Sequence, residues 1–279
     1  MRRIFYFLAT NAAIMVVASI IMMMLPAKYQ TSDTNFLIIA LLFGFGGSIV
    51  SLLMSKSMAK RGAGVHIIEA PRNEVEQWLV STVARQAKLA GIGMPEVGIF
   101  DTPDMNAFAT GANKNNALVA VSTGLLQNMS REEAEAVMGH EIAHVANGDM
   151  ITLTLIQGVV NTFVLLLARA LAMAIDRDGR GFGYYIGFYG GQIVFGFLAS
   201  IIVAFLSRHR EFRADEGGAK YASSAAMIGA LERLKQGQAG ELPNQLAAFG
   251  INSSVKSLFS THPPLDDRIA ALKANSNNS

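Results

Sequence analysis

The sequence predicts a mainly helical α+β protein in which a soluble domain is combined with four transmembrane helices. Three observations support this fold class. Hydrophobic residues make up 51% of the chain and charged residues only 16%, whereas about 25% charged residues is usual in soluble proteins. Four long apolar runs are present, and the segments between them carry helix-like and strand-like patterns. No cysteine occurs, so disulfides and thiolate metal ligands are excluded.

The first two apolar runs predict an N-terminal transmembrane hairpin over residues 1–58. Residues 4–25 and 36–54 lack charge, and each can cross a hydrocarbon core of about 30 Å. A cleaved signal peptide is the alternative for the first run, but that run is too long and no small-residue cleavage site follows it. Basic residues lie outside both ends of the hairpin, and the connecting loop holds only Lys28. This asymmetry predicts that both ends face the cytoplasm.

The other two runs predict a second transmembrane hairpin over residues 151–206. Residues 182–206 are uncharged, whereas two amides and an arginine interrupt residues 151–175. A buried hairpin in a soluble protein is therefore the alternative for this pair. Three arginines follow the last run, which favours a return to the cytoplasm.

The remaining segments predict a soluble domain in two parts, residues 59–150 and 207–279, on either side of the second hairpin. Residues 72–90 have the spacing of an amphipathic helix that ends near Gly91. A short helix is expected after Thr261. Three short runs are typical of strands: 97–100, 105–110 and 117–123.

The stretch "SREEAEAVMGHEIAHVANGD" is the strongest chemical signal in the chain. Ser130 and Glu133 form the pattern of a capping box, which predicts a helix start. On that helix His140 and His144, four residues apart, project from one face and can hold one metal ion. Glu141 lies about 100° around the helix axis, where it suits a general base better than a ligand. The alternative is an ordinary helix that carries two histidines.

A catalytic zinc site needs a third protein ligand and an open position. The best candidate lies in "SRHREFRADEGGA", where Glu211 and Asp215 share one helix face. Glu211 is the candidate ligand, and Asp215 is expected to accept a hydrogen bond from the second nitrogen of a ligand histidine. The alternative for Glu211 is a solvated charge among neighbouring arginines.

"HEIAH", an apolar hairpin, "REFRAD" and "THPPLDDRI" follow one another in an order that resembles the HtpX family of bacterial membrane zinc metalloproteases, relatives of the CAAX prenyl endopeptidases. The resemblance implies a gluzincin-type domain in the cytoplasm and one Zn²⁺ per chain, bound by His140, His144 and Glu211. It implies that Glu141 is catalytic. It also implies a multi-pass protein of the bacterial inner membrane that acts in stress response and quality control.

The resemblance further implies a histidine near the cleft at the position of His262, which is the candidate stabiliser of the oxyanion. The alternative is a structural histidine at a helix start. Arg268 is a weaker candidate for the same role, and a surface arginine is the favoured interpretation. Residues 105–111 and 118–124 are expected to pair as strands, so that an edge strand with Asn106, Ala107 and Phe108 could bind an extended substrate. The alternative is a plain core hairpin.

The leading interpretation is a membrane-bound zinc endopeptidase that hydrolyses misfolded or damaged membrane proteins. Its partners would be such substrates and the lipid bilayer, because a net charge of +2 without a basic stripe argues against nucleic acid. One alternative is a protease that cleaves within the membrane, although the charges before His140 are costly in lipid. The other alternative is a zinc-binding adaptor without catalytic activity.

Overall fold

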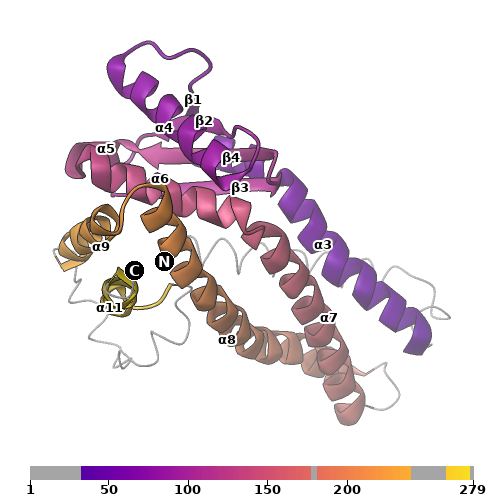
Figure 1. Ribbon diagram of the computed structural model, residues 1–279. Coiled ribbons are helices and arrows are strands. Elements are labelled where there is room, and N and C mark those ends of the chain that lie inside the picture. Colours follow the sequence, from indigo (N-terminus) through magenta and orange to yellow (C-terminus); the bar gives the residue numbers. More distant parts are fainter. Residues whose placement is uncertain (1–32, 177–180, 240–261, 277–279) are drawn as a thin grey trace. The chain divides into compact units, whose positions relative to one another are not determined.

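The computed structural model describes residues 33–176, 181–239 and 262–276 (Figure 1). These residues are mainly helical and include one four-stranded sheet. They divide into two compact units: one comprises residues up to Ser51 with Leu153–Val203, and the other comprises Leu52–Thr152 with the residues from Ala204 onward. The first expected span, residues 4–25, lies outside the described residues.

Three of the described helices are long and apolar enough to cross a membrane: α3 (Asp33–Gly62), α7 (Asp149–Ile175) and α8 (Phe182–Tyr221). They contain the three other apolar runs. Large apolar side chains remain exposed on the last two helices, including Ile193 at 75% and Phe163 at 60%. A hairpin buried inside a soluble protein would cover such side chains, so their exposure favours the membrane hairpin over that alternative.

The unit made of the residues up to Ser51 and Leu153–Val203 contains most of the apolar parts of these three helices, so we call it the membrane unit. Its helices pack closely. Gly44 of α3 lies against α7, where an added Cβ would stand 2.9 Å from the Gly158 carbonyl oxygen and contact the Thr162 hydroxyl. Small residues at such contacts let backbones approach closely in lipid. The guanidinium of Arg169 lies 4.3 Å from the ring centre of Phe36. The buried apolar residues around this contact are Phe36, Ala40, Leu165, Ala168, Ala172 and Phe188.

The other unit comprises Leu52–Thr152 with the residues from Ala204 onward. It contains the segments predicted to form the soluble domain, so we call it the soluble unit. It is built on a sheet with strand order β1-β2-β4-β3. Its strands are β1 (His66–Ile67), β2 (Glu96–Phe100), β3 (Ala107–Asn113) and β4 (Asn116–Ser122). Strands β2 and β4 run parallel, and β3 pairs antiparallel with β4. The expected pairing of these last two segments is confirmed. Because β3 is the outermost of the described strands, its far side is an unpaired sheet edge.

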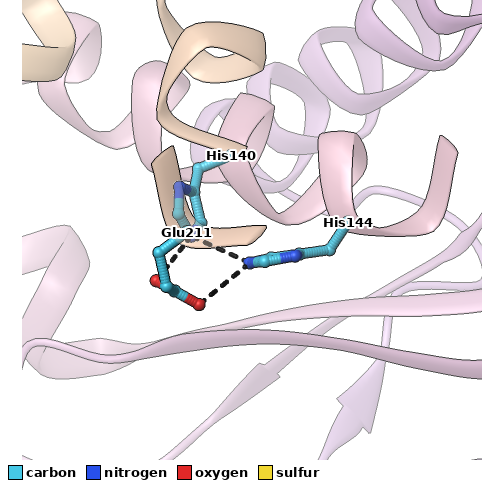
Figure 2. A group of neighbouring side chains, drawn as sticks. All are labelled: His140, His144 and Glu211. Carbon is cyan, nitrogen blue, oxygen red and sulfur yellow. Dashed lines mark hydrogen bonds and ion pairs between the residues drawn. The ribbon is translucent and has the colours of Figure 1, made fainter. Parts of the chain in front are cut away.

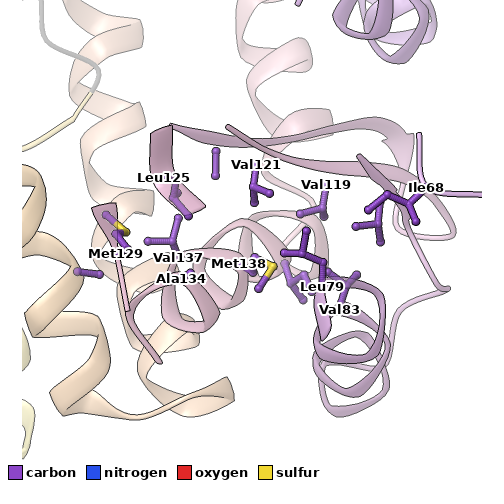
Figure 3. Packing of buried hydrophobic residues seen from close by; sticks show 14 residues of the cluster. Ile68, Leu79, Val83, Val119, Val121, Leu125, Met129, Ala134, Val137 and Met138 are labelled. Carbon is purple, nitrogen blue, oxygen red and sulfur yellow. The ribbon is translucent and has the colours of Figure 1, made fainter. Parts of the chain in front are cut away.

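Helices α4 (Glu74–Ala90) and α6 (Arg131–Ala146) pack against one face of this sheet (Figure 3). The amphipathic pattern of α4 is confirmed, since Asn73 caps its start and Gly91 ends it with a positive φ of 67°. Alternate residues of β4 and one side of each helix form the core. Its members include Leu79, Val83, Val119, Val121, Leu125, Val137, Met138 and Ile142.

A second core lies where α6 meets the C-terminal helices α9 (Ser224–Ala239) and α11 (Leu265–Ser276). The short helix α5 (Thr123–Asn128) connects β4 to α6. This second core consists of Ala136, Ala226, Met227, Leu231, Ile269 and Leu272. Helix α6 is therefore packed against the sheet and against the C-terminal segments, which fixes the side chains that it carries.

Candidate metal centre

Helix α6 carries the central motif, and its two ends confirm the capping prediction. The Ser130 side chain accepts a hydrogen bond from the Glu133 N–H, and the Glu133 carboxylate accepts one from the Ser130 N–H. The helix stops at Ala146, and Gly148 adopts a positive φ of 67° that turns the chain into α7. His140 is buried in α6, and His144 is half-buried one turn later.

Glu211 of α8 meets both histidines, although 66 residues separate it from the second one (Figure 2). The two Nε2 atoms lie 3.1 Å apart. Glu211 Oε2 lies 3.6 Å from His140 Nε2, and Oε1 lies 3.4 Å from His144 Nε2. Ligands about 2.1 Å from a tetrahedral zinc lie about 3.4 Å from one another. Two imidazoles and one carboxylate at this spacing therefore fit zinc.

Two glycines allow α8 to approach α6 closely at this point. A Cβ at Gly218 would stand 2.9 Å from the Ala136 carbonyl oxygen, and one at Gly217 would overlap the Ala143 side chain. Side chains at either position would separate the helices. The "EGGA" that follows the expected ligand thus brings the carboxylate within reach of the histidines.

The other ring nitrogen of His140 faces Asp215. Its Nδ1 lies 2.9 Å from Asp215 Oδ1, so the nitrogen and the carboxylate that the prediction pairs lie close together. Arg268 of α11 donates two hydrogen bonds to the same carboxylate, from Nε to Oδ2 at 2.7 Å and from Nη2 to Oδ1 at 2.5 Å. Burial opposes its charge, but these hydrogen bonds and the nearby carboxylates outweigh burial and raise the pKa of Arg268.

The interpretation of Arg268 as a surface residue is therefore wrong. Its side chain is only 7% exposed, and its Nη1 also lies 3.3 Å from Glu211 Oε2. No local pattern identifies this role, because the partner carboxylate lies 53 residues earlier in the chain.

The Nδ1 atom of His144 lies 2.7 Å from Asp149 Oδ2. Burial favours the neutral imidazole, but hydrogen bonds with Asp149 and Glu211 outweigh burial and raise the pKa of His144 to about 10 in the metal-free protein. Asp149 is not among the site residues that the sequence predicts. The signal that could have found it is the "GD" directly after the helix that carries both histidines.

Glu141 points toward the sheet edge and is not one of the three clustered donors. Its Oε2 accepts a hydrogen bond of 2.8 Å from the Ala109 N–H of β3. The Ser122 N–H donates to the Asn106 carbonyl at the start of the β3–β4 pair. Because antiparallel residues alternate between pairing and outward directions, the Ala109 N–H points away from β4. The outer edge of β3 thus lies beside Glu141, the expected general base, one residue after His140.

His262 reaches the same centre from the segment before α11. Its Nδ1 lies 2.7 Å from Glu211 Oε2, and its side chain is 58% exposed. Ala107 and Phe108, expected to contact substrate, lie in β3, with Asn106 directly before them. The Phe108 ring packs 5.3 Å from that of Phe100. The expected site residues therefore gather around α6, the edge of β3, the C-terminal part of α8 and the segment before α11.

Comparison with known proteins agrees with this geometry. The family model of peptidase family M48 matches residues 73–276, a span that contains every ligand candidate. The chain belongs to peptidase family M48. This M48 peptidase is 58% identical over 283 residues to Protease HtpX of Stenotrophomonas maltophilia (strain K279a), covering 98% of each chain. It is 56% identical to a Protease HtpX homolog of Thiobacillus denitrificans (strain ATCC 25259 / T1), covering 98% of this chain and 99% of the relative.

The fold of the M48 peptidase is also found in a crystal structure of S. mikatae Ste24p. The two agree with a TM-score of 0.69 at 17% identity, over 98% of this chain and 67% of that chain. The expected resemblance to the HtpX proteases is confirmed by the full-length relatives. The chain is thus a metallopeptidase and a multi-pass membrane protein.

Proposed function

We propose that this peptidase is a zinc-dependent endopeptidase of the gluzincin type, with one zinc held by His140, His144 and Glu211. The observation that carries the proposal is the spacing of their donor atoms, 3.1 to 3.6 Å. When bound, zinc supplies a coordinated water of lowered pKa and polarises the peptide carbonyl. Three protein ligands leave a coordination position for that water, whereas a structural zinc site is closed by four.

Glu141 is the proposed general base. It takes a proton from the attacking water and delivers it to the leaving amine. Its position next to His140 in α6 puts the carboxylate beside the ligands, and the hydrogen bond from Ala109 fixes one of its oxygens. A base held in this way keeps its orientation as the substrate enters.

His262 is the proposed stabiliser of the oxyanion. Its exposed ring lies against Glu211, so it can turn toward a substrate carbonyl while remaining at the centre. An N–H directed at the developing negative charge lowers the transition-state energy. Asp215 is proposed to orient His140 through the Nδ1 contact.

The edge of β3 is the proposed substrate-binding strand, with Asn106, Ala107 and Phe108 on the path of the peptide. An extended peptide that pairs with this edge would be held through its backbone, which tolerates many side chains. Such tolerance suits an enzyme that acts on unfolded or misassembled membrane proteins, and the relatives that are named Protease HtpX support a protease of this kind.

We further propose four membrane spans in a bacterial inner membrane, including residues 4–25, with both termini and the catalytic domain in the cytoplasm. The domain would then consist of residues 59–150 and 207–279, and the two hairpins of residues 1–58 and 151–206. The basic residues that flank the hairpins support this orientation. Cleavage within the bilayer is disfavoured, because α6 starts with the exposed charges of Arg131 and Glu132.

The decisive experiment measures zinc content and cleavage of an unfolded protein, such as casein, by the full chain in detergent micelles. Glu141→Gln is expected to keep the metal and to lose cleavage, because the amide cannot accept the proton. Glu211→Ala is expected to lower zinc occupancy. Wild-type cleavage by the first variant would remove Glu141 from catalysis. A folded wild-type protein that binds zinc without cleavage would instead fit the zinc-binding adaptor, and one that neither binds zinc nor cleaves would refute the proposal.

A further inference from the structure

A closed ring of contacts surrounds His144. Its Nε2 faces Glu211 Oε1 at 3.4 Å, and its Nδ1 faces Asp149 Oδ2 at 2.7 Å. Arg210, the residue before Glu211, donates from Nη1 to the Asp149 carbonyl oxygen at 2.8 Å, and its Nε lies 3.8 Å from Asp149 Oδ1. His144 and Glu211 are therefore connected by two routes. One is the direct contact at the metal position, and the other runs through Asp149 and Arg210 on the opposite side of the imidazole ring.

Because Asp149 is buried, its negative charge depends on compensation by neighbouring groups. Asp149 is only 5% exposed, although it stands at the turn between α6 and α7. The left-handed turn at Gly148 returns the chain toward the helix that has just ended. A buried carboxylate requires compensation by hydrogen bonds or an opposite charge, and His144 and Arg210 provide both.

We propose that Asp149 is a positioning residue for His144, and that Arg210 in turn fixes Asp149. This inference rests on the proposed zinc site. A carboxylate at Nδ1 selects the tautomer whose Nε2 lone pair is available to a cation, and it also fixes the rotation of the ring. Asp215 has the same relation to His140, with Arg268 in the place of Arg210. Each histidine ligand would thus have its own aspartate and arginine.

If Asp149 had a purely structural role, its removal would have the same effect as removal of another acidic residue in the first turn of a helix. Asp149 is the acidic residue in the first turn of α7, where a negative charge stabilises the helix terminus. Asp266 occupies the equivalent first turn of α11, where it forms an ion pair with Lys235. Asp266→Ala is therefore the matched control, because it removes a first-turn carboxylate without touching the metal ligands.

The experiment compares full-length wild type, Asp149→Ala, Asp149→Asn and Asp266→Ala in detergent micelles. Zinc affinity is measured by competition with a chromogenic chelator, and the visible absorption of bound Co²⁺ reports the ligand geometry. We expect Asp149→Ala to bind zinc about 10- to 100-fold more weakly and to change the Co²⁺ spectrum. Asp149→Asn keeps an acceptor oxygen for Nδ1–H and should recover most of the spectrum and part of the affinity. Asp266→Ala should match the wild type.

Wild-type affinity and an unchanged Co²⁺ spectrum in Asp149→Ala would overturn the inference. An equal loss in Asp266→Ala would also overturn it, because a helix-terminus effect would then explain both variants. If Asp149→Ala does not fold, the same measurements are made on Asp149→Asn and Arg210→Gln. Arg210→Gln is expected to bind zinc more weakly than the wild type. Failure of the wild type to bind either metal would refute the proposed function itself, so the two failures are distinguishable.

Discussion

Arg268 and Asp215 form a bidentate ion pair inside the soluble unit, with two hydrogen bonds of 2.5 and 2.7 Å. Both residues are buried, and the pair joins α11 to α8 beside Nδ1 of His140, a proposed metal ligand. Removal of one partner from such a pair leaves a buried charge without compensation.

Arg268→Ala should therefore lower the free energy of unfolding by about 3 to 5 kcal/mol. Urea unfolding of the detergent-solubilised protein, followed by tryptophan fluorescence, measures this change. Lys273→Ala is the control in the same helix, because its ion pair with Glu232 is exposed and should contribute at most about 1 kcal/mol. Equal stability of the two variants would contradict the assigned role of the buried pair.

Ala109→Pro should reduce catalysis without loss of the metal. Proline lacks the N–H that binds Glu141, and it is tolerated at a sheet edge where that N–H points outward. We expect kcat to fall on the order of tenfold, with zinc content and unfolding close to those of the wild type. Phe108→Pro is the contrasting variant, since by alternation its N–H faces β4, and it should destabilise the sheet. Full activity of Ala109→Pro would show that the hydrogen bond is dispensable.

Zinc binding should release protons at neutral pH. In the metal-free protein the pKa of His144 is raised to about 10, so this histidine is protonated below that pH and must lose its proton to become a ligand. The apparent zinc affinity should then rise about tenfold per pH unit between pH 7 and 9. Calorimetric titration in two buffers of different ionisation enthalpy counts the released protons. A flat affinity over this range would contradict a protonated His144.

Gly44→Ala should destabilise the membrane unit. The added methyl group would stand 2.9 Å from the Gly158 carbonyl oxygen, and overpacking of this kind costs about 1 to 3 kcal/mol. Gly46→Ala in the same helix is the matched control, because no atom lies within 4 Å of its added Cβ. Unfolding in mixed micelles with increasing SDS measures both variants. Equal transitions would mean that the α3–α7 contact tolerates a methyl group.

The parts of the molecule that the sequence predicts are those with a local pattern. Ser130 and Glu133 predict the start of α6, and the spacing of His140 and His144 places both on one face. The short apolar run of β4 and the long apolar runs of α7 and α8 likewise identify their elements. Asp215 could be predicted because it stands one helical turn after Glu211.

The residues that escaped prediction depend on tertiary contacts. Asp149 follows the turn at Gly148, so the helical spacing that relates the histidines does not extend to it. Arg268 meets Asp215 only because α11 packs against α9, and its charge alone favours a surface position. The hydrogen bond between Ala109 and Glu141 involves a backbone group, which leaves no trace in residue type.

The donors of the proposed metal centre lie on opposite sides of the apolar segments of α7 and α8 in the chain: the histidines precede α7, and Glu211 follows the apolar part of α8. During synthesis the two histidines leave the ribosome first, and the third donor emerges only after both hairpin helices have been made. A half-made chain therefore carries an incomplete centre. The order of translation itself would keep this protease inactive until its own second hairpin is available for insertion.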